Sequence, residues 1–139
     1  MSIERFCADD SLLALVVRAD FKADGIAFFT EQDSSQQLGY MNREAGYEVQ
    51  PHFHKSLRKE VHATQEVLFI RTGSCQLDLY GNSKSVRVST ILRQGDVVLL
   101  ADGGHGLVML EQTEIIEVKQ GPYAGDDDKV RFNPAETTS

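Results

Sequence analysis

Short hydrophobic runs, separated by Gly, Asp, Asn and Ser, recur along the chain at intervals of roughly ten residues. Many of these runs are rich in Val, Ile, Leu and Phe, and in several of them apolar and polar side chains alternate. Alternation of this kind is typical of β-strands, and regularly spaced strands predict an all-β sandwich or barrel. The predicted strands are residues 12–19, 25–30, 37–42, 47–54, 66–72, 75–80, 86–92, 96–101, 106–110 and 114–119.

The sequences between the strands support this prediction. YGNSK (80–84) and RQGD (93–96) each contain a glycine between two predicted strands, where tight turns favour a positive φ angle. Residues 9–20 also offer an Asp N-cap for a helix, but their apolar run is unbroken rather than amphipathic, so a strand is favoured. The KADG sequence that follows (22–25) is interpreted as a hairpin turn.

Length and composition limit the number of domains and the class of partner. With 139 residues, 41% of them hydrophobic, the chain is long enough for one domain with its own core. The formal net charge of -7 disfavours a nucleic-acid partner, which is bound through clustered Lys and Arg. The apolar runs are too short for a membrane-spanning helix, which needs about 20 residues. Two distant cysteines and an N-terminus without a secretory signal indicate a reduced, cytoplasmic protein.

The sequence changes character near residue 124. AGDDDKVRFNPAETTS (124–139) is polar and loses the alternation of the preceding strands. We therefore predict a single domain over residues 1–123 and a polar C-terminal segment or tail over residues 124–139.

Histidine is scarce, and two of the four histidines lie two positions apart in PHFHK (51–55). In a strand over 47–54 their side chains project to the same face, so both imidazoles can bind one ion. The same pattern also fits the polar face of an ordinary half-exposed strand. His52 and His54 are therefore candidate metal ligands whose assignment depends on other residues.

Two further side chains can complete such a site. In its predicted strand Glu66 shares a face with Leu68 and Ile70, so its carboxylate is turned toward an apolar interior. A carboxylate in such surroundings is normally paired or bound to a metal. His105 lies at the start of a later strand, where a packed or solvated histidine is the alternative to a ligand.

The spacing of these residues resembles the two sequence motifs of the cupins, over roughly residues 35–120. The first motif is a glycine, five residues, HxH, a spacer, a glutamate, six residues and a glycine; GYEVQPHFH (46–54) and EVLFIRTG (66–73) match both fixed intervals. The second motif, Gly-Asp followed by a Pro-x-Gly turn and a histidine, is similar to GDVVLLADGGH (95–105). The chain departs from the family in a long spacer before Glu66, in Ala101 at the usual proline, and in one residue fewer before His105.

The cupin resemblance implies an all-β, single-domain β-barrel, also described as a double-stranded β-helix or jelly roll, with a metal centre. The ligands of the family map onto His52, His54, Glu66 and His105. Three imidazoles and one carboxylate suit a divalent Fe, Mn, Ni, Co or Zn ion and leave a position open for water or substrate. His62, inside the long spacer, is an alternative ligand.

A narrower resemblance links the chain to uncharacterised bacterial cupins associated with sugar and surface-polysaccharide biosynthesis. It rests on TQEVLFIRTG (64–73), GGHG (103–106) and IIEVKQGPYAGDDDKVRF (115–132). It implies a small polar metabolite, such as a sugar, as ligand. Six residues are candidates for binding such a substrate, and for each of them ordinary packing or solvent exposure is the alternative to a substrate contact. Lys119 in particular also fits a surface residue that alternates outward from Ile116 and Val118. These candidates are Tyr40, Asn42, Gln50, His62, Lys119 and Tyr123.

The expected function is a metal-binding cupin that acts on a small polar metabolite by Lewis-acid or metal-water chemistry. The alternative is a non-catalytic metabolite-binding or sensory module. Further alternatives are a dTDP-sugar ketoisomerase and an iron-dependent dioxygenase, because one fold hosts many reactions. A homodimer is expected, since an edge strand such as LLALVV (12–17) is often covered by a partner.

Overall fold

The computed structural model describes residues 2–84 and 87–134 and confirms the all-β prediction. The strands pair antiparallel throughout the described residues, which contain no α-helix. The chain forms two compact units, which we describe separately. The sheet unit consists of Met1–Phe21 and Ala63–Ser139, and the hairpin unit consists of Lys22–His62.

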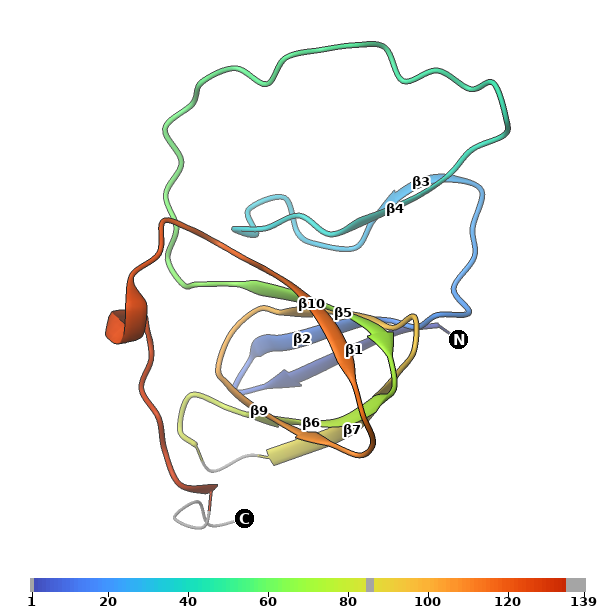
Figure 1. Cartoon of the computed structure of the whole chain (residues 1–139). Coiled ribbons are helices and arrows are strands. Elements are labelled where there is room, and N and C mark those ends of the chain that lie inside the picture. Colours follow the sequence, from blue (N-terminus) through green and yellow to red (C-terminus); the bar gives the residue numbers. More distant parts are fainter. Residues whose placement is uncertain (1, 85–86, 135–139) are drawn as a thin grey trace. The chain divides into compact units, whose positions relative to one another are not determined.

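The sheet unit contains a five-stranded and a three-stranded sheet (Figure 1). In the larger sheet the order is β1 (Ile3–Ala8), β2 (Ser11–Val17), β8 (Val97–Leu100), β5 (Glu66–Thr72) and β10 (Glu114–Lys119). In the smaller sheet the order is β7 (Arg87–Arg93), β6 (Ser74–Tyr80) and β9 (Gly104–Met109). A 3-10 helix follows β10 at Gly125–Asp128.

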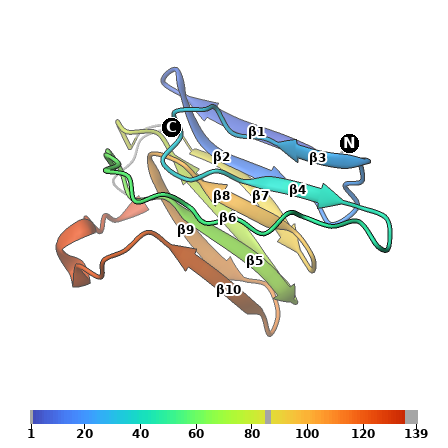
Figure 2. The same cartoon turned by 90° about the horizontal axis from the view of Figure 1, so that it is seen from above.

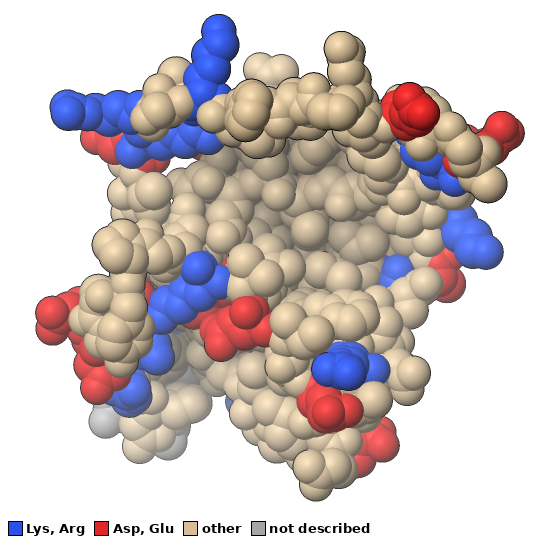
Figure 3. All heavy atoms as spheres, turned by 45° about the horizontal axis from the view of Figure 1, so that its top comes forward, with Lys and Arg blue, Asp and Glu red and all other residues tan. Residues whose placement is uncertain are grey.

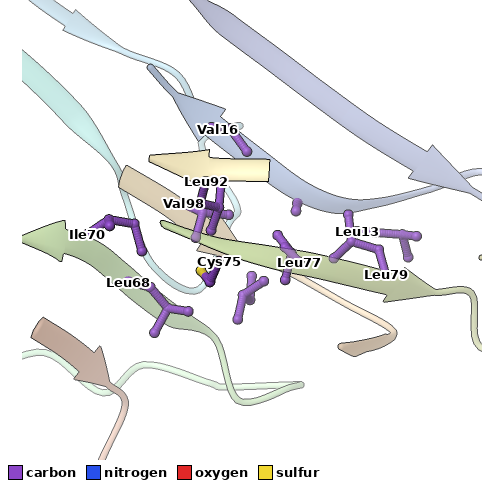
Figure 4. Packing of buried hydrophobic residues seen from close by; sticks show 11 residues of the cluster. Leu13, Val16, Leu68, Ile70, Cys75, Leu77, Leu79, Leu92 and Val98 are labelled. Atoms are coloured by element: carbon purple, nitrogen blue, oxygen red, sulfur yellow. The ribbon is translucent and has the colours of Figure 1, made fainter. Parts of the chain in front are cut away.

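A hydrophobic core joins the two sheets (Figure 4). On β6 every second residue from Cys75 onward belongs to this core, as expected for a strand with one face buried. Each fully buried Leu or Ile side chain contributes about 1.5–3 kcal/mol, so the core is the main attraction between the sheets. Its buried members are Leu13, Ala14, Val16, Leu68, Ile70, Cys75, Leu77, Leu79, Leu92, Val98 and Leu100.

The unbroken apolar run of β2 reflects burial on both faces of the strand. Residues 13–16 have no exposed surface, and β2 is paired with β1 on one side and with β8 on the other. A strand buried on both faces needs no polar alternation, which explains why a strand rather than a helix forms here. Because both edges of β2 are paired within the chain, LLALVV is not an edge strand that a second copy could cover.

A buried ion pair ties the end of β2 to the turn between β7 and β8. Asp96 is 4% exposed and accepts a hydrogen bond from Arg18 Nη1 at 2.9 Å. It also accepts hydrogen bonds from the backbone N–H groups of Ala19 at 2.9 Å and Arg93 at 2.8 Å. Arg18 donates in addition to the carboxylate of Glu4 on β1. These contacts hold three strands and one turn in a fixed arrangement.

Two of the three predicted turns are confirmed. In YGNSK the N–H of Lys84 donates to Gly81 O at 2.8 Å, and in RQGD the N–H of Asp96 donates to Arg93 O at 2.9 Å. Gly95, in the second turn, has a φ of 89°. The prediction of a hairpin turn at KADG is wrong, because β2 pairs with β1 and β8 rather than with the next strand.

The hairpin unit consists of β3 (Gly25–Phe28) paired with β4 (Gly39–Asn42), followed by a long irregular segment. The prediction of a strand over 47–54 is wrong, because no strand forms between residues 43 and 65. Residues 43–64 are exposed. Pro51 has no N–H for a strand ladder, and Phe53, expected on the buried face, is 99% exposed. Without a buried face, nothing fixes the register of a strand there.

The first strand of the sheet unit was not predicted. Figure 2 shows β1 alongside β2, with which it pairs from Ile3 to Ala8. Its two adjacent charged residues, Glu4 and Arg5, obscure the strand pattern in the sequence. The strand predicted over 86–92 is observed as β7, and residue 86 lies outside the described residues, as do residues 135–139 of the predicted C-terminal segment.

Candidate functional site

Glu66 and His105 come together between the two sheets, each near the start of its strand. Glu66 begins β5 on the face of Leu68, as predicted, and its side chain is 14% exposed. His105 lies on β9 opposite Leu79, and its side chain is 35% exposed. Glu66 Oε2 and His105 Nε2 are 3.9 Å apart. Two candidate ligands from distant parts of the sequence are therefore neighbours.

The residue before Glu66 is held by hydrogen bonds that fix where the strand begins. The N–H of Gln65 donates to Gln120 Oε1 at 2.8 Å, and its side-chain amide donates to Ala101 O at 3.3 Å. Gln65 is itself buried. The carboxylate of Glu66 therefore projects from a rigid strand rather than from a loop.

A second carboxylate, Glu117 of β10, hydrogen-bonds to the side chain of Glu66. Burial, this hydrogen bond and the negative charge of Glu117 raise the pKa of Glu66 to about 7, against the opposing charges of Lys119 and Lys129. Glu66 therefore binds a proton more tightly than an ordinary glutamate does. Glu117 is not among the site residues predicted from the sequence.

The inward face of β10 is the opposite of the one that its apolar residues suggested. Ile116 and Val118 are 47% and 55% exposed, whereas Ile115 packs against the core. Glu117 and Lys119 share the face of Ile115, because side chains alternate along a strand. The interpretation of Lys119 as an outward surface residue is therefore wrong, and Glu117 is found only once the inward face of β10 is known.

Burial lowers the pKa of the His105 imidazole. The negative charge of Glu117 opposes this shift, and the positive charge of Lys129 adds to it. The imidazole is therefore neutral at neutral pH, which is the form that binds metal ions.

The separation of Glu66 and His105 suits two ligands of one divalent ion. Two donors about 2.0–2.2 Å from one tetrahedral ion lie about 3.4 Å apart, so a small movement of either side chain would bring this pair to that spacing. A carboxylate and an imidazole are also the donor types preferred by Zn, Fe and related ions. Within the described residues, neither unit gathers three or more His, Cys, Asp or Glu side chains around one point. The sheet unit by itself thus offers a two-ligand fit.

The other two predicted ligands form a pair in the hairpin unit. The rings of His52 and His54 are 5.1 Å apart between centroids at an interplanar angle of 71°, and both residues are exposed. Nδ1 of His52 lies 2.8 Å from the carbonyl oxygen of Gln50. The two imidazoles are neighbours even though the strand predicted to align them does not form.

The predicted substrate ligands are dispersed. Tyr40 and Asn42 lie on β4, and Gln50 and His62 lie in the exposed segment that follows it, with His62 Nε2 3.9 Å from Glu60 Oε2. In the sheet unit, Tyr123 is 93% exposed. Lys119 forms an ion pair with Asp128 at 3.4 Å.

A cavity of about 570 Å³ adjoins Glu66 and His105 in the sheet unit. It follows both faces of β9, which is the edge strand of the smaller sheet, and residues 128–134 form its opposite wall. The ring of Phe132 in this wall packs edge-on against Tyr80, with centroids 4.9 Å apart. Part of the polar segment predicted after residue 123 therefore lines the cavity.

Asp78 of β6 lines the same cavity and was also missed. Its carboxylate accepts hydrogen bonds from Gln76 Nε2 at 2.8 Å, from Ser89 Oγ and from Arg87 Nη2 at 3.2 Å. Burial alone would raise the pKa of Asp78, but these hydrogen bonds and the charge of Arg87 hold it below its usual value. A polar residue on the outward side of a strand gives no signal of this network in the sequence.

Asp78→Asn is expected to destabilise the protein by about 1–2 kcal/mol near neutral pH, and by progressively less in acid. The pKa of Asp78 is depressed in the folded state, so its carboxylate stabilises the fold above the ordinary pKa of 3.8. This contribution is lost as the pH falls through the folded-state pKa, where both side chains become neutral. Urea unfolding of the two proteins across the acid range measures the difference, and a difference independent of pH would contradict the assignment.

Comparison of the chain with protein-family models, with curated proteins and with solved structures finds no match.

Within the described ranges, no helix has the length and apolar character to cross a membrane. Basic and acidic side chains occur side by side on the face shown in Figure 3.

Proposed function

We propose that this chain is a cupin whose sheet unit is a jelly-roll β-barrel and whose metal centre binds a small polar metabolite such as a sugar. The approach of Glu66 Oε2 to His105 Nε2, 3.9 Å across the two sheets and beside a cavity, carries the proposal. His52 and His54 are ligands by the resemblance of the sequence to the cupin motifs alone. A divalent Fe, Mn, Ni, Co or Zn ion suits these donors, and a cytoplasmic homodimer is part of the same proposal.

The side chains around this pair have separate roles in the proposal. A bound divalent ion supplies Lewis acidity toward a substrate oxygen or water. In this proposal Glu117, which is hydrogen-bonded to Glu66, takes or gives a proton at its carboxyl oxygen. Leu107 and Val108 give the cavity an apolar side, which strengthens polar contacts made inside it.

A non-catalytic metabolite-binding or sensory module is the second candidate. It is favoured by the absence, within the described part of either unit, of a cluster of three potential ligands. In this case Glu66, Glu117 and His105 contact the metabolite directly and no bond is broken. A dTDP-sugar ketoisomerase and an iron-dependent dioxygenase are narrower forms of the enzymatic proposal.

Metal analysis tests the first candidate. Protein purified without a chelating tag and offered each of the five metals is expected to bind about one ion per chain, as measured by elemental analysis after dialysis. Glu66→Gln and His105→Ala should each weaken metal binding by more than the 10–100-fold typical of losing an outer-shell partner. The double variant His52→Ala, His54→Ala should do the same.

Glu111→Gln is the matched control, because Glu111 is exposed and hydrogen-bonds only to Ser74 and Thr113 in the described residues. Its metal content should equal that of the wild type. Wild-type protein without stoichiometric metal, or a Glu66→Gln variant that retains it, would overturn the metal centre in favour of the second candidate.

A further inference from the structure

The outer face of β6 presents a buried carboxylate with one oxygen available to a ligand. Asp78 points away from the core, because its neighbours Leu77 and Leu79 point into it. The hydrogen bonds that hold Asp78 all end on Oδ1. Oδ2 has no partner among the residues that the structure describes, although the side chain is only 10% exposed. Oδ2 is not a fully buried atom, so this unpaired oxygen is accessible at the cavity that Asp78 lines.

The strand beside Asp78 has glycine at two of its three positions on the same face, and the third is Val108, opposite Gln76. β9 has Gly104 directly opposite Tyr80 and Gly106 directly opposite Asp78. Neither glycine has a positive φ angle, so the backbone does not require glycine at these positions. The two positions must therefore be explained by the space that they leave.

The two glycines differ in what occupies that space. A Cβ atom on Gly104 would come within 3.1 Å of the Phe132 ring, so an aromatic side chain already fills this position. A Cβ atom on Gly106 would meet no atom within 4 Å. The open space at Gly106 therefore belongs to a cavity whose lining also includes Asp78, Tyr80 and Phe132.

We propose that this volume is a binding site for a small neutral polyol or sugar, with a ligand hydroxyl donating a hydrogen bond to Oδ2 of Asp78 above Gly106. The ion pair with Arg87 at 3.2 Å already compensates the charge of Asp78, which favours a hydroxyl over a cation. Aromatic side chains at one end of the site offer apolar surface to the C–H groups of such a ligand. The site lies on the opposite face of β9 from His105 and does not require metal there.

Titration of isotope-labelled protein with D-glucose, D-mannose, N-acetyl-D-glucosamine and glycerol at millimolar concentrations tests the site by NMR. At least one of these probes should produce saturable shifts of the amide signals of Asp78, Ser89 and Gly106. Gly106→Val should abolish the shifts while leaving the unfolding midpoint near that of the wild type, because the added side chain enters empty space. Gly106→Ala provides the same test with a smaller group.

Asp78→Asn should weaken binding at least tenfold, because an amide oxygen is a weaker acceptor than a carboxylate. Asp102→Asn, at an exposed aspartate outside the cavity lining, is the control and should bind as the wild type does. No saturable shift with any of the four probes, or full binding by both Gly106 variants, would overturn the site. Because metal content is measured separately, failure here is distinguishable from failure of the proposed metal centre.

Discussion

Asp96→Ala is expected to lower the free energy of unfolding by about 3 kcal/mol, the scale of removing one partner from a buried ion pair. The substitution leaves Arg18 without its buried partner and removes the acceptor of two backbone N–H groups, those of Ala19 and Arg93. Arg18 keeps its contact with Glu4, which limits the loss. Urea unfolding monitored by circular dichroism should show a lower midpoint with an unchanged slope.

Two variants show whether the effect belongs to this network. Asp96→Asn keeps an oxygen acceptor without the charge and should fall between the wild type and the alanine variant. Asp102→Ala removes an exposed carboxylate whose side chain accepts a hydrogen bond from Asn82 at 3.3 Å, and should change stability by less than about 0.5 kcal/mol. An Asp96→Ala variant that is no less stable than Asp102→Ala would contradict the account.

Gly73→Ala is expected to destabilise the protein by at least about 3 kcal/mol. Gly73 joins β5 to β6 with a φ of 86°, a conformation that residues with a Cβ atom rarely adopt. A Cβ atom there would also come 2.3 Å from Gln112 O and 2.8 Å from Thr113 Cα. These are backbone atoms, so the clash cannot be relieved by turning a side chain. Thermal and urea unfolding measure the loss.

Gly106→Ala is the matched control for this substitution. It is also a strand-associated glycine of the sheet unit, but it has neither a positive φ angle nor an atom within 4 Å of the added Cβ. Its stability should stay within about 1 kcal/mol of the wild type. If the two alanine variants were equally stable, the tight turn at Gly73 would not be a requirement of the fold.

Strands in which apolar and polar residues alternate, or in which both faces are apolar, were predictable from the sequence, because the order of residues shows which faces are buried. Residues 66–72 form β5 with Glu66 on the face of Leu68, as the pattern indicated. The sequence does not show that the strand over 47–54 is absent, because apolar and polar residues alternate there more regularly than in β5, where residues 67–70 are all apolar. What differs is the lack of any surface to cover its apolar face, as the exposure of Phe53 shows.

The candidate site was only partly predictable for a related reason. Both faces of β10 carry apolar residues, so the sequence does not reveal that Ile115 rather than Ile116 faces the core. That single choice decides whether Glu117 points toward Glu66 or into solvent. The approach of Glu66 to His105 was inferred from a family resemblance, and its distance depends on the packing of two sheets that local sequence does not encode.

β2 is synthesised well before β8, a strand with which it pairs. Val17 and Val97 are register partners about 80 residues apart, with the whole hairpin unit between them. At a synthesis rate of about 5–20 residues per second, β2 waits several seconds before its partner leaves the ribosome. During that time β2, with six consecutive apolar residues, has one open edge, which is a site where the edge strand of another chain can pair.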